Sequence, residues 1–160
     1  MTLAVHPSVR RATEADADAL YRLSEPFMRG GALRRRTIAD YRAAVGWYLV
    51  VPGVLGPDGC AALRPLPSDP VHPAAGVLYN LCVRAGRQGA GLGRSLVEGV
   101  LDEAARQGVR EVFTATTGDG RLFHRYGFRQ VPPAGAPAPW AAALDPARGS
   151  RVYRWEAPAP

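Results

Sequence analysis

The sequence contains no lysine, and all 20 of its basic residues are arginine. Without lysine, the chain can form no Schiff base with a carbonyl substrate and lacks the lysine of a phosphate-binding P-loop. Every cationic contact must therefore come from arginine. The formal net charge of +6 favours an anionic partner, either nucleic acid or a phosphorylated cofactor with an acidic substrate.

Cysteine is scarce, and long apolar runs are absent. Cys60 and Cys82 lie in apolar segments without CxxC or Cys/His spacing, which predicts buried free thiols and no metal site. No window is apolar over the roughly 18 residues that a membrane span needs, and residues 1–13 show no signal-peptide pattern. We expect an untargeted cytoplasmic protein without membrane contact.

The length of 160 residues fits a single domain covering residues 1–160, with residues 1–7 and 157–160 as flexible ends. Apolar periodicity and turn residues predict helices and strands in alternation. The first expected helix begins at the N-cap Thr13 and ends near Pro26. The other expected helices cover residues 37–45, 92–107 and 120–126. The expected strands are 9–11, 47–51, 60–63, 76–83, 111–116, 127–131 and 150–155, and residues 132–139 are expected to form a loop.

The strongest functional signal is the glycine-rich stretch from Gln88 to Gly93. It lies between an apolar strand and the most regular helix, so that free backbone N–H groups point at an anion near the helix N-terminus. Glycine lets the main chain approach phosphate oxygens closely, and Arg87 and Arg94 add positive charge. This arrangement predicts a pyrophosphate-binding loop.

Two other interpretations of this loop remain. One is a glycine-rich turn that binds no ligand. The other is a dinucleotide-binding loop, which needs GxGxxG spacing in a βαβ unit that opens the chain. The spacing here is GxGxG, the loop lies past the middle of the chain, and no acidic residue follows at the required place. The dinucleotide interpretation is the weaker one.

The loop resembles that of the GNAT acetyltransferase superfamily, whose pattern Gln/Arg-x-x-Gly-x-Gly/Ala is matched by Gln88, Gly91 and Gly93. The pair Gly127 and Phe128 is similar to a second landmark of that superfamily. The resemblance implies an α/β fold with a central mixed, mostly antiparallel sheet, splayed between strands 4 and 5 and flanked by helices. It also implies acetyl-CoA as the cofactor, bound in that gap. The implied cofactor residues are Leu81, Cys82 and Val83 through their backbone, and Arg87, Gln88, Gly89, Ala90, Gly91, Leu92, Gly93 and Arg94 at the pyrophosphate.

A closer resemblance, over roughly residues 9–155, is to the acetyltransferase domain of the N-acetylglutamate synthase family, which serves arginine biosynthesis. The amino-acid kinase domain that many of these synthases carry is absent, so the chain looks like a short stand-alone form. The similar segments are 9–13, 31–36, 60–63 with Pro65 and Pro67, 112–113, 116–117, 125–128 and 148–150.

The resemblance implies a site for glutamate, whose two carboxylates need two separate donor groups, each preferably an arginine. Arg36, at the end of a run that includes Arg34, matches the family's arginine for one carboxylate. Arg148 and Ser150 match its pair for the other. Without the resemblance, the arginine run would equally suit a solvated surface or a nucleic-acid patch.

Direct transfer to an amine requires a polarised thioester carbonyl, a leaving sulfur that is stabilised or protonated, and a base. The backbone N–H groups near Leu81 can polarise the carbonyl, and the resemblance gives the hydroxyl of Thr116 to the leaving sulfur. Phe123 stands where the superfamily usually carries a tyrosine for that role, and phenylalanine has no hydroxyl to donate. Thr116 could instead be a strand residue that faces the core.

The expected base departs from the family pattern. Val77 stands where the family carries a glutamate, and Tyr79 and Asn80 replace small residues of the same strand, which narrows or changes the acceptor pocket. A relayed water, His72 or His124 remains as an acceptor of the proton, although a single histidine is more often structural.

Three functions follow from these observations. The first is N-acetylation of L-glutamate, favoured by the retained arginines. The second is acetylation of another small amine, such as glutamine, another polar amino acid or an amine-bearing antibiotic, favoured by the substitutions at 77, 79 and 80. The third is an acyl-CoA-binding regulator without activity. Nucleic-acid binding is disfavoured because the arginines are scattered along the chain, and a homodimer is left open.

Overall fold

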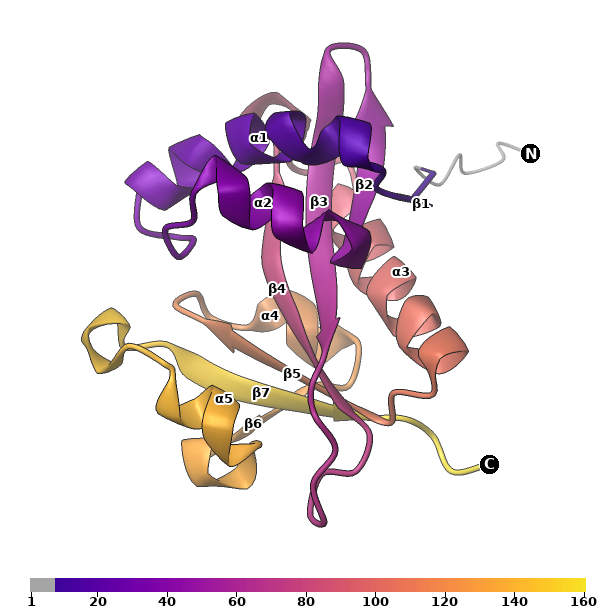
Figure 1. Cartoon of the computed structure of the whole chain (residues 1–160), viewed down its shortest axis with the longest axis vertical. Coiled ribbons are helices and arrows are strands. Elements are labelled where there is room, and N and C mark those ends of the chain that lie inside the picture. Colours follow the sequence, from indigo (N-terminus) through magenta and orange to yellow (C-terminus); the bar gives the residue numbers. More distant parts are fainter. Residues whose placement is uncertain (1–7) are drawn as a thin grey trace. The chain divides into compact units, whose positions relative to one another are not determined.

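The computed structural model describes residues 8–160 (Figure 1). Within these described residues, seven strands form one mixed sheet in the order β1-β2-β3-β4-β5-β7-β6. The neighbours are antiparallel from β1 to β3 and from β5 to β6, whereas β4 and β5 run parallel. The predicted α/β class and mixed, mostly antiparallel sheet are confirmed. The expected flexible end at residues 1–7 lies outside the described residues.

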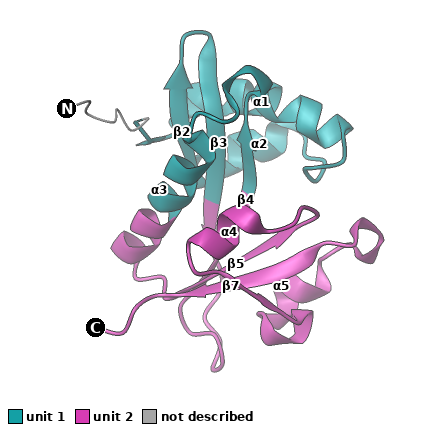
Figure 2. Ribbon diagram, turned by 180° about the vertical axis from the view of Figure 1, so that it is seen from behind, with its two compact units in different colours: residues 1–62, 80–100 teal, residues 63–79, 101–160 magenta. Residues whose placement is uncertain are grey.

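The chain divides into two compact units that interleave in the sequence (Figure 2). Among the described residues, unit 1 comprises residues 8–62 and 80–100, and unit 2 comprises residues 63–79 and 101–160. The strands β3 (Gly56–Pro65) and β4 (Ala75–Val83) each contribute residues to both units.

Unit 1 places helices on both faces of its strands. Figures 1 and 2 show α1 and α2 on one face of β2 and β3, and the first part of α3 on the other. Residues from both sides of the strands fill its core, and Leu20, Val50 and Leu96 are fully buried. Its elements are β1 (Arg10–Arg11), α1 (Ala17–Arg29), α2 (Ile38–Ala44), β2 (Tyr48–Gly53), the first part of β3, the end of β4 and the start of α3 (Leu92–Gln107).

The first helix runs further than its sequence predicts. The helix was expected to end near Pro26, but α1 continues to Arg29. Pro26 lacks the backbone N–H of one helical hydrogen bond, yet its carbonyl still accepts the N–H of Gly30 at 3.0 Å. Met28, in the last turn, is buried, so packing holds this turn in place. The cap of α2 is as predicted, because Thr37 and Asp40 form a capping box.

The hairpin of β2 and β3 is longer than predicted. Residues expected to form its turn belong to the strands, and only Val54 and Leu55 connect them. The register shifts between Val51 and Pro52, which accommodates a proline in the ladder. This extension brings Asp58 into a strand, next to the glycine-rich loop described below.

Unit 2 is built on β5 (Glu111–Thr116), with β7 (Arg151–Glu156) antiparallel to it and β6 (Arg129–Val131) on the far side of β7. The start of β4 pairs with β5 only from Ala75 to Val77. At the next position the hydroxyl of Thr114 donates to the carbonyl of Leu78 at 2.9 Å. The main-chain ladder therefore ends early, as a splay between these strands requires.

The core of unit 2 is aromatic. Phe123, Phe128 and Tyr153 pack with ring centroids 5.4 to 6.3 Å apart, and Phe113 packs against Trp140 at 6.1 Å. The short helix α4 (Arg121–Arg125) begins at Gly120, whose φ of 74° and close approach to the ring of Tyr153 exclude a side chain at this position.

The connection from β6 to β7 was expected to be a loop at residues 132–139, and this was partly wrong. A 3-10 turn (Pro133–Gly135) and the helix α5 (Ala138–Ala142) form there. Prolines at the first turn of a helix cost little, because their missing N–H has no partner there in any case. Near the end of the described residues, the backbone N–H of Ala157 donates to the carbonyl of Arg110. The guanidinium of Arg110 in turn donates to the carbonyl of Pro158. Among residues 8–160, no helix is long and apolar enough to cross a bilayer.

Candidate functional site

The glycine-rich loop lies in unit 1, where the sequence places it. It follows β4 and a 3-10 turn (Ala85–Arg87) and leads into α3, whose observed bounds match the prediction. Gly89 and Gly91 have φ of 84° and 82°, a conformation that favours glycine. Nothing lies within 4 Å of a Cβ built on either residue, so the space above the loop is open.

The loop offers backbone donors without acceptors. Within the described residues, the N–H groups of Gly89, Ala90 and Gly91 donate no hydrogen bond. The first N–H groups of α3, from Leu92 onward, have no helical partner by the geometry of any helix start. A row of such N–H groups at the positive end of a 16-residue helix fits a pyrophosphate. Arg94, in the first turn, is exposed beside them.

A carboxylate that the sequence did not single out organises the arginines of this loop. Asp58 bonds the Nε of Arg84 at 3.1 Å and the Nε of Arg87 at 3.2 Å. The side chain of Asp58 is 15% exposed, whereas that of Arg87 is 52% exposed. Arg87, a predicted cofactor residue, is therefore held at the loop while its guanidinium still reaches solvent. Sequence patterns missed Asp58 because its neighbours Pro57 and Gly59 suggested a turn.

The predicted pantetheine-binding residues form the end of β4. Leu81 and Val83 are half-buried, and Cys82 is buried. The carbonyl of Val83 accepts the side-chain amide of Gln88 at 3.1 Å, which ties the strand to the loop. The strand end and the glycine-rich loop are thus one continuous segment of unit 1.

Asn80 is the most constrained polar residue of unit 1. It is buried and has a φ of 53°, which is rare for any residue except glycine and asparagine. Its Oδ1 accepts from Tyr41 at 2.8 Å and from Arg36 at 3.3 Å, and its Nδ2 donates to Ser24 at 2.9 Å. The sequence placed Asn80 in the acceptor pocket, but its side chain is saturated by protein contacts. We describe Asn80, Ser24, Tyr41 and Cys60 as the Asn80 network.

The two cysteines are buried free thiols, as predicted. Their sulfur atoms lie 3.7 Å apart on neighbouring strands, and Cys60 also contacts the amide of Asn80 at 3.5 Å. The hydrogen bond with Cys82 and burial both raise the pKa of the Cys60 thiol well above its ordinary value. Burial likewise raises the pKa of Tyr41. The Asn80 network is therefore neutral near pH 7.

Arg36 lies at the edge of this network. Its backbone N–H contacts the sulfur of Met28 at 3.2 Å, and its guanidinium bonds Asn80 and, at 3.4 Å, the carbonyl of Arg34. Arg36 is half-buried, whereas Arg34 and Arg35 are exposed. Of the three arginines, Arg36 is the one whose position these contacts fix. Arg34 contributes its carbonyl to that positioning.

Three further predicted residues gather at one end of unit 2. Thr116 is the last residue of β5, and it pairs with Arg151 in the adjacent strand. Ser150 directly precedes Arg151, and Arg148 ends the 3-10 turn (Pro146–Arg148) before it. Asp145 caps that turn by accepting the N–H of Ala147 at 3.0 Å. Thr116, Ser150 and Arg148 are all half-buried, so Thr116 is not a fully buried core residue.

The hydroxyl of Thr116 keeps its proton available. Its oxygen accepts the N–H of Gly118 at 3.1 Å, which leaves the O–H free to donate to another group. Phe123, at the position of the superfamily's tyrosine, is buried in the aromatic core. Tyr79, a predicted acceptor-pocket residue, is half-buried in unit 2.

The candidate bases differ in position. Val77 is buried and pairs with Phe113 in the ladder. His72 bonds Glu111 at 3.0 Å, at the opposite end of β5 from Thr116. Because a strand rises about 3.3 Å per residue, this is about 17 Å from Thr116, so His72 is excluded as a base at that end. His124 is exposed and packs edge-on against Tyr153.

A glycine-rich loop at the start of a long helix, next to a mixed sheet with a short parallel pair, is a geometry that suits the diphosphate of a cofactor. The family model for the acetyltransferase (GNAT) domain matches residues 44–130. The chain belongs to this family, as the sequence predicted. The match includes β4, the loop and α3.

Curated relatives carry the description amino-acid acetyltransferase. The protein from Azotobacter vinelandii is 29% identical over 149 residues, which is 91% of this chain and 33% of the relative. The protein from Escherichia coli K12 is 25% identical over 123 residues, which is 77% of this chain and 27% of the relative. The chain spans about a third of the length of these relatives.

Solved structures show the same fold. N-acetylglutamate synthase from Neisseria gonorrhoeae, complexed with coenzyme A and N-acetyl-glutamate, matches with a TM-score of 0.84 at 22% identity, over 93% of this chain and 34% of that one. The structure of Rv2747 from Mycobacterium tuberculosis, in complex with CoA and NLQ, matches with a TM-score of 0.80 at 22% identity. That match covers 95% of this chain and all of the other.

Proposed function

We propose that this protein is an acetyl-CoA-dependent amino-acid N-acetyltransferase whose acceptor is the α-amine of L-glutamate, serving arginine biosynthesis or a related pathway. Membership of the acetyltransferase (GNAT) family and the descriptions of the curated relatives support the reaction class. The Neisseria gonorrhoeae synthase with coenzyme A and N-acetyl-glutamate supports the acceptor. The two free thiols suit the cytoplasmic location that we propose.

The observation that carries the proposal is the open loop at residues 88–93. Its unpartnered N–H groups at the start of α3, and the arginine that Asp58 holds beside them, suit a pyrophosphate with its negative charge. We assign the pyrophosphate of acetyl-CoA to these donors and its pantetheine arm to the backbone of Leu81, Cys82 and Val83.

When bound, acetyl-CoA supplies an acetyl group activated as a thioester. The chain's own residues then have three tasks in direct transfer to the amine. Backbone N–H near Leu81 polarises the carbonyl that the amine attacks, and a relayed water or His124 takes the proton that the amine loses. As the carbon–sulfur bond breaks, the hydroxyl of Thr116 donates a hydrogen bond to the departing thiolate, which leaves as coenzyme A. The free O–H of Thr116 and its half-buried position support this role.

Two arginines and a serine support a dicarboxylic acceptor. Arg36 is oriented by Asn80. Arg148 and Ser150 lie just before the start of β7, whose first residue, Arg151, pairs with Thr116. Guanidinium groups bind carboxylates through paired, charge-assisted hydrogen bonds. We assign one glutamate carboxylate to Arg36 and the other to Arg148 and Ser150.

A second acceptor class is favoured by one observation. The position of the family's glutamate is occupied by Val77, which is buried in a hydrophobic ladder and cannot accept a proton. Glutamine, another polar amino acid or an amine-bearing antibiotic would then be the acceptor, with a relayed water or His124 as base.

The reaction is tested by the release of free coenzyme A thiol from acetyl-CoA, with a panel of amino acids and aminated antibiotics. Turnover with glutamate at the highest kcat/KM would support the first assignment, and a preference for another amine would replace it with the second. Tight acetyl-CoA binding without turnover of any acceptor would leave only an acyl-CoA-binding regulator. A protein that binds no coenzyme A would refute the proposal as a whole.

Arg148→Ala tests the acceptor site. We expect the acceptor KM to rise by at least about tenfold, since a charged hydrogen bond contributes about 1.5–3 kcal/mol, while the acetyl-CoA KM stays unchanged. Arg121→Ala is the matched control, because the Arg121 side chain is 92% exposed on α4. Equal rises of both KM values in Arg148→Ala would refute the role of Arg148.

A further inference from the structure

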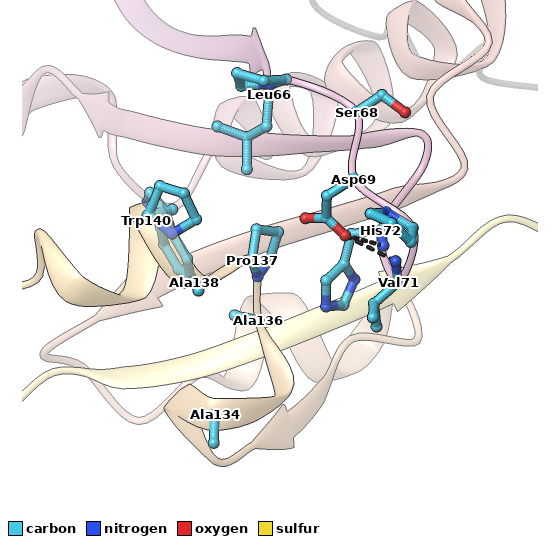
Figure 3. A pocket seen from close by; sticks show the side chains of 13 residues that line it. Leu66, Ser68, Asp69, Val71, His72, Ala134, Ala136, Pro137, Ala138 and Trp140 are labelled. Carbon is cyan, nitrogen blue, oxygen red and sulfur yellow. Dashed lines mark hydrogen bonds between the residues drawn. The ribbon is translucent and has the colours of Figure 1, made fainter.

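Unit 2 contains a cavity of about 530 Å³ that the proposed reaction does not use. Two segments line it (Figure 3): residues 66–72, between β3 and β4, and residues 134–140, which include the start of α5. A cavity of this size lies in the range of small-molecule sites, which is about 300–1,000 Å³. It lies beside His72 and Glu111, at the end of β5 opposite to Thr116.

Most of the lining is apolar and rigid. Four prolines, Leu66, Val71 and Trp140 supply ring and aliphatic surfaces, and a proline offers no backbone N–H. Trp140 is held by packing against Phe113, at a centroid distance of 6.1 Å. A ligand body in this cavity must therefore be mainly apolar.

One carboxylate points into this apolar space. The Oδ1 of Asp69 accepts the N–H of Val71 at 2.8 Å and the N–H of His72 at 2.7 Å, which fixes the side chain. The other oxygen points toward the cavity in Figure 3, and it has no hydrogen-bond partner among residues 8–160. The Nδ1 of His72 is bonded to Glu111, which itself bonds Arg154.

We infer that this cavity binds a small organic cation, an ammonium or guanidinium group joined to an apolar body. An ionised carboxylate only accepts hydrogen bonds, so its free oxygen selects a donor of positive charge. The indole of Trp140 adds a surface that attracts cations through its π-face and packs against apolar groups. An anion of the same size is excluded by repulsion from Asp69.

The test uses phenethylammonium as the probe and 3-phenylpropionate as a probe of similar size and opposite charge, each titrated by calorimetry without coenzyme A. Asp69→Asn removes the charge but keeps an oxygen for the N–H groups of Val71 and His72. Asp119→Asn is the matched control, because Asp119 also accepts a backbone N–H, that of Arg121 at 3.0 Å, and lies outside the cavity.

We expect the wild-type protein and Asp119→Asn to bind phenethylammonium equally, and Asp69→Asn to bind it at least about tenfold more weakly. Trp140→Ala should also weaken binding. The phenylpropionate anion should not bind to the wild-type protein. Equal binding of both probes, equal affinity in Asp69→Asn and the wild type, or no binding of the cation would each overturn the inference. Circular dichroism spectra and thermal midpoints establish that each variant is folded, and Trp140→Ala retains the test where Asp69→Asn does not fold.

Discussion

The two units bury polar groups in different ways. In unit 1, the Asn80 network joins neutral groups, and every polar atom of the Asn80 side chain has a partner. In unit 2, the charged groups Glu111, Arg154 and Glu156 form a chain, and the imidazole of His72 is bonded to Glu111. The neutral network holds a strand backbone in an uncommon conformation, whereas the charged chain links neighbouring strands near the sheet end.

The difference has an energetic consequence. A neutral buried network loses stability when one member is removed, because its partners keep their desolvation cost without a hydrogen bond. A partly exposed ionic chain is screened by water and salt, so the loss of one charge costs less. Burial alone would lower the pKa of Arg154, but its hydrogen bond with Glu111 raises it above its ordinary value.

The largest effect is expected from Asn80→Ala. It leaves the hydroxyls of Tyr41 and Ser24 without this partner in a buried site and places alanine at a φ of 53°. We expect a loss of about 2–4 kcal/mol in the free energy of unfolding, measured by urea denaturation. Asn80→Gly separates the causes, because glycine adopts this φ without strain yet lacks the amide. Two variants as stable as the wild type would show that the network is not a source of stability.

Glycines with positive φ sharpen the comparison. A Cβ on Gly120 in unit 2 would meet the ring of Tyr153, whereas a Cβ on Gly91 in unit 1 would meet nothing within 4 Å. We expect Gly120→Ala to cost about 2–3 kcal/mol of stability through backbone strain and overpacking, and Gly91→Ala to cost about 1 kcal/mol.

The effect of the same two substitutions on the acetyl-CoA KM should follow the reverse order. Gly91→Ala places a methyl group where the loop approaches the phosphates, so the acetyl-CoA KM should rise by about tenfold or more. Gly120→Ala should leave this KM near the wild-type value at a temperature where the variant is folded. An unchanged acetyl-CoA KM in Gly91→Ala would contradict the assignment of the loop.

Much of the fold, and the place of the glycine-rich loop in it, could be predicted from local patterns. The bounds of α3 and β5 match the prediction, because an amphipathic period and a β-branched run are each complete within one segment. The glycine-rich loop follows the same logic, since its donors come from consecutive backbone atoms. Sequence alone could therefore predict the part of the site that depends on one segment of chain.

The remainder depends on contacts between distant segments. The length of α1 beyond Pro26 depends on the burial of Met28, and the role of Asp58 depends on a hairpin that places it beside Arg84. Asn80 was expected to face an acceptor, but Ser24 and Tyr41, 56 and 39 positions away, fill its hydrogen-bonding capacity. No local pattern encodes such partners.

Glu111→Gln tests the charged chain of unit 2. Glu111 bonds both His72 and Arg154, and the Arg154 side chain is 31% exposed. We expect a loss of about 1–2 kcal/mol at low salt, smaller than that of Asn80→Ala because solvent screens the arginine. Added salt should reduce this loss but leave the effect of Asn80→Ala unchanged. Equal salt dependence of the two variants would contradict the distinction between the units.

The smallest expected effect is on the stability of the fold at acid pH. Arg10 bonds Asp16 at 2.8 Å and lowers the pKa of that carboxyl from 3.8 to about 2. Because the folded-state pKa is the lower one, this stabilisation is fully present above about pH 4 and is lost as the pH falls toward 2. Asp16→Asn should flatten the stability curve between these values. The expected change is below about 1 kcal/mol, since the Arg10 side chain is 46% exposed.

The Asn80 network should contribute equally to stability at pH 7 and pH 4, because none of its groups titrates in that range. The loss of stability of unit 1 in acid would then come from the surface pair of Arg10 and Asp16. If the stability of Asp16→Asn falls as steeply between pH 4 and pH 2 as that of the wild type, this pair is not the source of the loss.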